Sequence, residues 1–136
     1  MNCPRSHKDL VVWKKAMELS VLTYELVKGM PKAEQYGLTS QMLRASVSIP
    51  ANIAEGNSRG SRKDYARFVS IARGSTAELE TYFELVVRVK LLESDTVARA
   101  MELNDEIGRM LNSLRAKLSQ EDSGFGEDDQ DYLFNP

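Results

Sequence analysis

The chain has 136 residues, which is enough for one domain whose core needs neither disulfides nor a structural metal. Its one cysteine excludes an internal disulfide framework, and no apolar run reaches the roughly 20 residues of a membrane-spanning helix. We therefore expect a soluble, cytoplasmic protein with no signal peptide and no membrane partner.

The formal net charge of −2 is divided unevenly along the chain. Residues 119–136 carry six acidic residues and no lysine or arginine, so taking their −6 from the total of −2 leaves +4 on residues 1–118. A modestly positive body is compatible with nucleic-acid binding. The tail of residues 119–136 adds glycine, serine and glutamine to its acids, a composition that predicts disorder.

The first apolar repeat predicts a helix that starts near Asp9 and is stopped by Gly29 and Pro31. Two apolar rows run side by side along it. One row contains Leu10, Trp13, Met17, Val21, Tyr24 and Val27, and the other contains Val12, Ala16, Leu19, Leu22 and Leu26. One neighbour within the chain requires only one row, so we expect this helix to cover its own core and also a second subunit.

A second helix is expected from a cap at Thr39 or its neighbour to Gly56. Pro50 lies inside it, lacks a backbone N–H, and has a ring that displaces the carbonyl of Ser46. The helix either bends there, helped by nearby serine hydroxyls, or breaks at Ile49 so that Pro50 starts a new helix. We expect the bend.

Two further helices follow. Ser61 and Asp64 resemble a capping box, with Asp in place of the usual Glu, and open a third helix expected to reach about Leu92. Its interior Gly74 predicts a close approach of a neighbouring backbone. A fourth helix is expected from Ser94 or the next residue, with a nearly heptad row at Val97, Met101, Asn104, Ile107, Leu111, Leu114 and Leu118.

Four amphipathic helices with short connections, and no strand pattern, predict an all-α fold. The expected architecture is an antiparallel up-down-up-down four-helix bundle with a kinked second helix. Its expected divisions are a flexible N-terminus at 1–8, the bundle at 9–118 and the acidic disordered tail at 119–136.

Two motifs within this pattern resemble a known family: SIPANIAEG followed by Arg59, and then ARGSTAELE after a gap of twelve residues. They resemble the four-helix-bundle proteins encoded in 23S ribosomal RNA intervening sequences. That family also includes the accessory variability determinant of diversity-generating retroelements. The resemblance extends from about Asp9 to Leu118. It implies a homo-oligomer in the form of a pentameric ring, contact with RNA or DNA and, in a retroelement, a reverse transcriptase as partner.

A basic turn between the second and third helices supplies the candidate nucleic-acid residues, which are Arg59, Arg62, Lys63 and Arg67. Each can meet a phosphate, and repetition around a ring would extend the positive surface. The alternative is a solvated corner whose arginines pair with Asp64 and Glu55. The acidic tail either solubilises the protein or folds onto this corner, and we expect the former.

The polar members of the two motifs also have two interpretations. They either form a structural polar network that fixes helix alignment or an exposed face that meets a partner, and we expect the network. Its expected members are Asn52, Glu55, Arg73 and Glu78.

Catalytic chemistry has little support. The one histidine, His7, precedes the first helix, which excludes a di-iron bundle enzyme, an Arg–His ribonuclease and a histidine-activated nucleophile. No phosphate-cradling glycine loop occurs. We expect a non-enzymatic protein without metal or cofactor that binds nucleic acid. The alternative is a protein-binding scaffold or adaptor with no nucleic-acid role.

Overall fold

The structure, a computed structural model, describes residues 6–120. Its elements are η1 (His7–Asp9), α1 (Val11–Val27), η2 (Lys32–Glu34), α2 (Leu38–Ser58), α3 (Arg62–Arg88) and α4 (Ser94–Leu118). The predicted all-α class is confirmed, because this part of the chain contains four long helices and no strand. Most of the expected flexible N-terminus and acidic tail lies outside the described residues.

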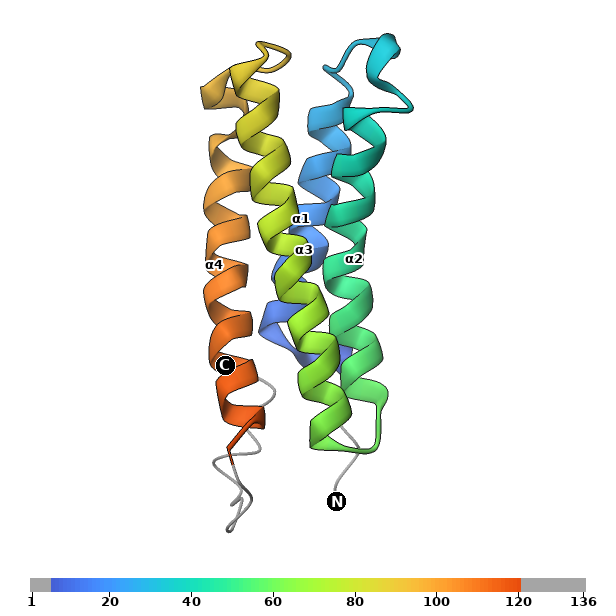
Figure 1. Cartoon of the computed structure of the whole chain (residues 1–136), viewed down its shortest axis with the longest axis vertical. Helices are drawn as coiled ribbons and strands as arrows, with labels where there is room; N and C mark the ends of the chain where they lie inside the picture. The colour runs from blue at the N-terminus through green and yellow to red at the C-terminus, as the bar shows by residue number, and fades with distance from the viewer. Residues whose placement is uncertain (1–5, 121–136) are drawn as a thin grey trace.

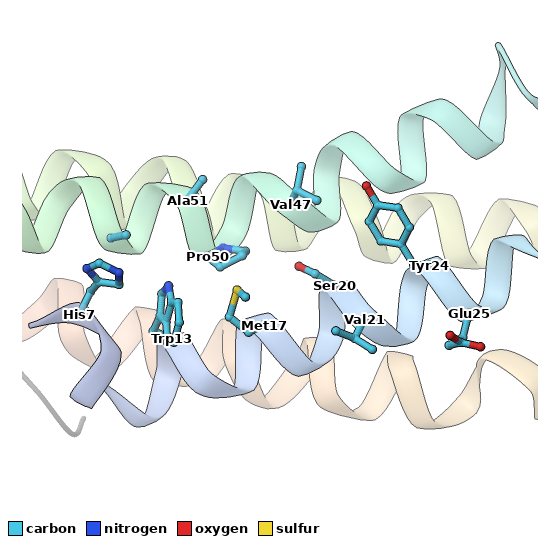
Figure 2. Close-up of a pocket in the computed structure, with 11 residues that line it drawn as sticks. His7, Trp13, Met17, Ser20, Val21, Tyr24, Glu25, Val47, Pro50 and Ala51 are labelled. Carbon is cyan, nitrogen blue, oxygen red and sulfur yellow. The ribbon is translucent and has the colours of Figure 1, made fainter.

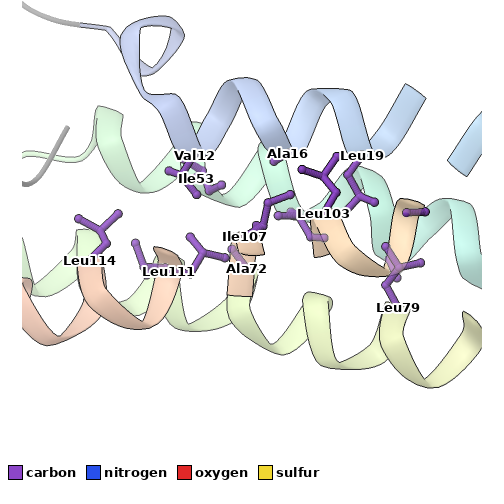
Figure 3. Packing of buried hydrophobic residues seen from close by; sticks show 14 of the residues in the cluster. Val12, Ala16, Leu19, Ile53, Ala72, Leu79, Leu103, Ile107, Leu111 and Leu114 are labelled. Carbon is purple, nitrogen blue, oxygen red and sulfur yellow. The ribbon is translucent and has the colours of Figure 1, made fainter. Parts of the chain in front are cut away.

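The four long helices lie alongside one another and surround a single apolar core (Figure 1). All four contribute side chains that are removed from water (Figure 3). Burying one such aliphatic side chain contributes about 1.5–3 kcal/mol. The fully buried residues include Val12, Leu19, Ile49, Ile53, Leu79, Phe83, Ile107, Leu111 and Leu114. No helix within residues 6–120 combines the length and apolar character needed to cross a lipid bilayer.

The two apolar rows of α1 separate as their spacing predicts. Val12, Ala16 and Leu19 are fully buried in the core. In the other row Val21 is 60% exposed and Tyr24 is 52% exposed. One row therefore belongs to the core, and the second is fully buried at Leu10 but exposed at Met17, Val21 and Tyr24.

The ends of the helices differ from the sequence expectations in three places. Asp9 does not start α1; it closes a capping box with Ser6 around η1. The expected cap at Thr39 or Ser40 is wrong, because α2 begins one residue earlier, at Leu38, after Gly37. A side-chain cap does operate at α3, where the Ser61 hydroxyl accepts from the backbone N–H of Asp64 at 3.1 Å.

The third difference is at the end of α3, which stops at Arg88 rather than near Leu92. Lys90 adopts a left-handed conformation with φ of 64°. Its N–H donates to the carbonyl of Val87 at 3.0 Å, and the N–H of Leu91 donates to that of Val86 at 2.9 Å. This Schellman arrangement satisfies the last carbonyls and ends the helix, and the position is one that usually favours glycine.

Pro50 lies inside a continuous α2, so the alternative of a break at Ile49 is wrong. The carbonyl of Ser46, four residues earlier, cannot receive the backbone hydrogen bond that proline lacks. Instead, the hydroxyl of Ser20 in α1 donates to it at 2.9 Å. A neighbouring helix thus satisfies the acceptor that proline leaves without an intrahelical partner.

Two helical glycines behave differently from each other. A Cβ on Gly74 would meet nothing within 4 Å, and the residue is exposed, so the expected close approach at Gly74 is wrong. A Cβ on Gly56 would lie 2.8 Å from Cβ of Phe68 in α3, closer than atoms can pack. Gly56 is therefore the position that lets α2 and α3 approach.

Candidate nucleic-acid interface

The four predicted basic residues lie at the end of the molecule where α2 ends and α3 begins (Figure 1). We call Arg59, Arg62, Lys63 and Arg67 the basic corner. The last turn of α4 reaches the same end, because Nη2 of Arg62 donates to the carbonyl of Lys117 at 2.8 Å. The chain therefore brings two segments together here that are 55 residues apart.

Arg62 differs from the other members of the basic corner. It is only partly exposed, and its hydrogen bond ties the start of α3 to the end of α4. Arg59, Lys63 and Arg67 are exposed. The structure thus assigns one of the four predicted residues a tethering contact and leaves three side chains on the surface.

The two exposed arginines of the corner share one aromatic ring. The guanidinium carbon of Arg59 lies 4.8 Å from the ring centroid of Phe68, and that of Arg67 lies 4.5 Å from it. Both distances are within the range of cation–π attraction, which is worth about 0.5–1 kcal/mol at exposed sites. Phe68 is half-buried and supports both side chains at the surface.

Each of these arginines also has a carboxylate neighbour. Nε of Arg59 lies 3.1 Å from Glu55, and Nε of Arg67 lies 3.8 Å from Asp64. Both are partly exposed helical pairs, so each contributes little to stability. These are the ion pairs that the sequence alternative expected, and they occur together with exposed guanidinium groups.

Tyr65 forms the buried base of the corner and is 8% exposed. Burial raises the pKa of its phenol, and a weaker opposing effect comes from the side-chain hydrogen bond with Asn57 at 3.5 Å. Its ring also lies against Gly56, where a Cβ would be 3.1 Å from Cδ1 of Tyr65. The phenol is therefore protonated at physiological pH and packs as a neutral group.

Two further basic residues extend the corner. Arg115 and Lys117 lie in the last turn of α4. Segments 55–67 and 115–117 together contain six basic and two acidic residues, a local net charge of +4. The sequence analysis did not propose the α4 residues; the signal was their position at the end of the fourth helix, which short connections bring back to the α2–α3 turn.

The expected polar network is not assembled as one group. Glu55, Arg73 and Glu78 are exposed. Asn52 is partly buried and donates within its own helix to the carbonyl of Ser48 at 2.8 Å and to its hydroxyl at 2.9 Å. The polar contact between helices here is made by Ser48 itself, because Ser75 of α3 donates to the same Ser48 hydroxyl at 2.9 Å.

A second polar contact between helices was missed by the sequence analysis. Asn104 interrupts the apolar row of α4 and is 3% exposed. Its side-chain amide donates to the carbonyl of Thr76 in α3 at 2.9 Å. An isolated polar residue in an otherwise apolar row was the available signal for this helix-aligning contact.

An apolar groove runs between α1 and α2, with a volume of about 560 Å³. Figure 2 shows Trp13 and Met17 of α1 lying toward α2, with Val47 and Pro50 on the opposite wall. The exposed row of α1 therefore forms one side of this groove. We call this feature the α1–α2 groove, lined by Trp13, Met17, Ser20, Val21, Tyr24, Val47, Pro50 and Ala51.

Residues 6–120 contain no group of three or more His, Cys, Asp or Glu side chains placed to hold a metal ion. The only functional geometry that they assemble from the sequence candidates is the basic corner. It has exposed cations beside an aromatic ring, which suits reversible contact with an anion.

Comparison with known proteins supplies a family. The family model for 23S rRNA-intervening sequence protein matches residues 8–113. A crystal structure of a protein of unknown function from the S23 ribosomal protein family of Bacteroides thetaiotaomicron is similar to this chain. The TM-score is 0.73 and the identity 28%, covering 77% of this chain and 98% of the other. No curated protein sequence matches.

Proposed function

Because the chain belongs to the family of 23S rRNA-intervening sequence proteins, we propose that it is a non-enzymatic, oligomeric protein that binds RNA or DNA through the basic corner. The observation that carries this proposal is the gathering of exposed Arg59, Lys63 and Arg67 beside the end of α4. Phosphate contacts by such residues supply affinity without requiring base recognition. The protein acts in the cytoplasm and needs no cofactor.

We also propose an antiparallel order for the four helices and a bend in α2. Short connections favour an antiparallel up-down-up-down order of the four helices. A bend of α2 at Pro50 is supported by the Ser46 carbonyl, which bonds to Ser20 of α1 instead of within its own helix.

We place self-association on the α1–α2 groove. Its apolar side chains are more exposed than a monomer needs, with Met17 at 41%, Val21 at 60% and Val47 at 41%. Family resemblance suggests a ring of five. In such a ring the basic corner is repeated once per subunit, so a modest local charge becomes an extended positive surface. In a retroelement, the resemblance adds a reverse transcriptase as a partner.

The proposal is tested by measuring binding of single-stranded RNA and duplex DNA across a salt series. The variant changes Arg59, Lys63 and Arg67 together to Ala; Arg62 is left intact because it tethers α4. At about 1 kcal/mol for each lost contact, three contacts correspond to roughly 100-fold weaker binding at low salt. The salt dependence should also become shallower, since each neutralised phosphate contributes about −0.7 to −0.9 to the slope.

The matched control changes Lys28, Lys32 and Arg88 to Ala at the opposite end of the molecule. Lys28 and Arg88 have carboxylate neighbours, as Arg59 and Arg67 do. If the control variant weakened nucleic-acid binding equally, the affinity would depend on the total charge of the protein and not on the basic corner. Absence of salt-dependent binding by the wild-type protein would refute the proposal.

A protein-binding scaffold is the second candidate, and the α1–α2 groove favours it. An apolar groove of about 560 Å³ is suited to a helix from another protein as well as to a second copy. A wild-type protein that is monomeric at micromolar concentration by light scattering, and that does not bind nucleic acid, would support this function instead.

A further inference from the structure

The two exposed arginines of the basic corner come from different segments. Arg59 follows the last residue of α2, and Arg67 lies in the second turn of α3. Both guanidinium carbons are measured from the same Phe68 centroid, at 4.8 and 4.5 Å, so they are at most about 9.3 Å apart. They form a pair built by tertiary structure and not by helical spacing.

Each guanidinium is restrained on two sides. Its planar group lies against Phe68, and its Nε, the nitrogen nearest the backbone, faces Glu55 or Asp64. The side chains of Arg59 and Arg67 nevertheless remain 42% and 58% exposed, so a ligand can approach them from solvent. A planar guanidinium presented in this way suits a phosphate oxygen better than a flexible ammonium does.

Gly56 allows this arrangement. With any side chain at this position, a Cβ would lie 2.8 Å from Cβ of Phe68, and either helix would have to move. Arg59 lies three residues after Gly56, and its backbone N–H donates to the Gly56 carbonyl at 3.1 Å. The close approach of α2 and α3 at Gly56 therefore places Arg59 over the Phe68 ring.

We propose that Arg59 and Arg67 act as one preorganised pair that grips neighbouring phosphates of a single nucleic-acid strand, and that Phe68 and Gly56 are its positioning residues. This inference rests on the proposed function. It adds which side chains hold the phosphate backbone of the nucleic acid and why those side chains are ordered before binding. Ordering the side chains before binding reduces the entropy lost when the phosphate contacts form.

The test replaces Phe68 with Leu and, separately, with Tyr. Leu fills the apolar space without a ring, whereas Tyr keeps the ring. We expect about 5- to 10-fold weaker binding of a single-stranded RNA oligonucleotide by Phe68→Leu and near wild-type binding by Phe68→Tyr. The salt slope of Phe68→Leu should equal that of the wild type, because every cation is still present. By contrast, Arg59→Ala should make the slope shallower.

A second variant tests the pair without changing a half-buried residue. Arg59→Lys combined with Arg67→Lys keeps both charges and removes both planar groups, and we expect it to weaken binding at least as much as Phe68→Leu. Arg88→Lys, at the other end of α3 and likewise beside a carboxylate, is the matched control and should leave binding within about twofold of the wild type. Unchanged affinity in both Phe68→Leu and the double lysine variant would overturn the inference.

The position of Arg59 and Arg67 against the Phe68 ring can be measured by NMR in the protein without nucleic acid. The side-chain Nε–H signals of Arg59 and Arg67 should carry ring-current shifts that persist in Phe68→Tyr and disappear in Phe68→Leu. Shifts that are absent from the wild type would overturn the pair whatever the binding result. Shifts that are present in a wild-type protein that binds no nucleic acid would mean that the proposed function fails although the arginines are paired.

Discussion

The basic corner and the α1–α2 groove are both exposed, but they hold their side chains in opposite ways. In the corner, Arg59 and Arg67 each have a ring and a carboxylate as neighbours. In the groove, Met17, Val21 and Tyr24 expose apolar surface instead. Water solvates a charged surface well, whereas a large exposed apolar patch favours association. The contrast fits the two roles proposed above, nucleic-acid binding by the corner and self-association through the groove.

The largest effect is expected from changing the α1–α2 groove while the basic corner is left intact. If the protein self-associates through the groove as proposed, changing Met17 and Val21 together to Asp should give monomers at micromolar concentration, because two unpaired carboxylates would be buried at the interface. Both residues are exposed within the subunit, so the core should be unaffected. Light scattering measures the oligomeric state, and circular dichroism checks the fold.

The control for this variant places Asp at Tyr36 and Val89, which are 92% and 51% exposed and lie outside the groove. It should keep the wild-type oligomeric state. Asp variants of the groove that remain oligomeric would show that self-association uses another surface.

An intermediate effect should come from the floor of the groove, where Ser20 supports α2. Ser20→Ala removes the donor to the Ser46 carbonyl and leaves a buried acceptor unsatisfied. We expect the free energy of unfolding to fall by about 1–3 kcal/mol, measured in urea. Ser58→Ala removes a serine-to-carbonyl bond that is exposed and should cost less than about 0.5 kcal/mol. Equal losses would mean that the Ser46 carbonyl does not depend on the Ser20 hydroxyl.

The smallest effect is expected from the ion pair of Lys15 and Glu106, which lacks an aromatic neighbour in the contacts described above. It can be compared with the arginine–carboxylate pairs of the basic corner. Lys15 of α1 lies 2.6 Å from Glu106 of α4, and this hydrogen bond lowers the pKa of the Glu106 carboxyl. A lowered folded pKa stabilises the protein above the unfolded pKa of about 4.3, and the benefit is lost as pH falls through the folded value. The pair is partly exposed, so we expect less than about 0.5 kcal/mol.

Glu106→Gln should therefore lower stability slightly at pH 7, and its difference from the wild type should shrink as pH falls below about 4.3. Parallel urea unfolding at pH 7 and pH 3.5 measures the difference between the two proteins. A gap that widens toward acidic pH would contradict the assigned direction of the pKa shift.

The helices and their core faces could be predicted because apolar spacing reports burial directly. Leu79, Phe83, Ile107 and Leu111 occupy the core faces that their periodicity indicates. The helix ends were predicted less well. Thr39 has capping chemistry but lies inside α2, and Lys90 ends α3 in a conformation more usual for glycine. Tertiary context outweighs local preference at both ends.

The site could be located from sequence, but the roles of its residues could not. Charge density marks the α2–α3 turn, yet it does not reveal that Arg62 is used as a tether. Helical spacing also does not reveal that Phe68 supports two arginines from different segments. Likewise, Gly56 and Gly74 look alike in sequence, and only the crossing of α2 and α3 distinguishes the crowded position from the open one.

Lys90 illustrates how the chain tolerates a local imperfection. Its left-handed backbone costs about 1 kcal/mol or more for a residue with a Cβ. The residue follows the end of α3, whereas the basic corner lies at the beginning of that helix, and it does not line the α1–α2 groove. Lys90→Gly should therefore remove this cost and raise the free energy of unfolding. The basic corner and the α1–α2 groove would be unaltered in this more stable variant.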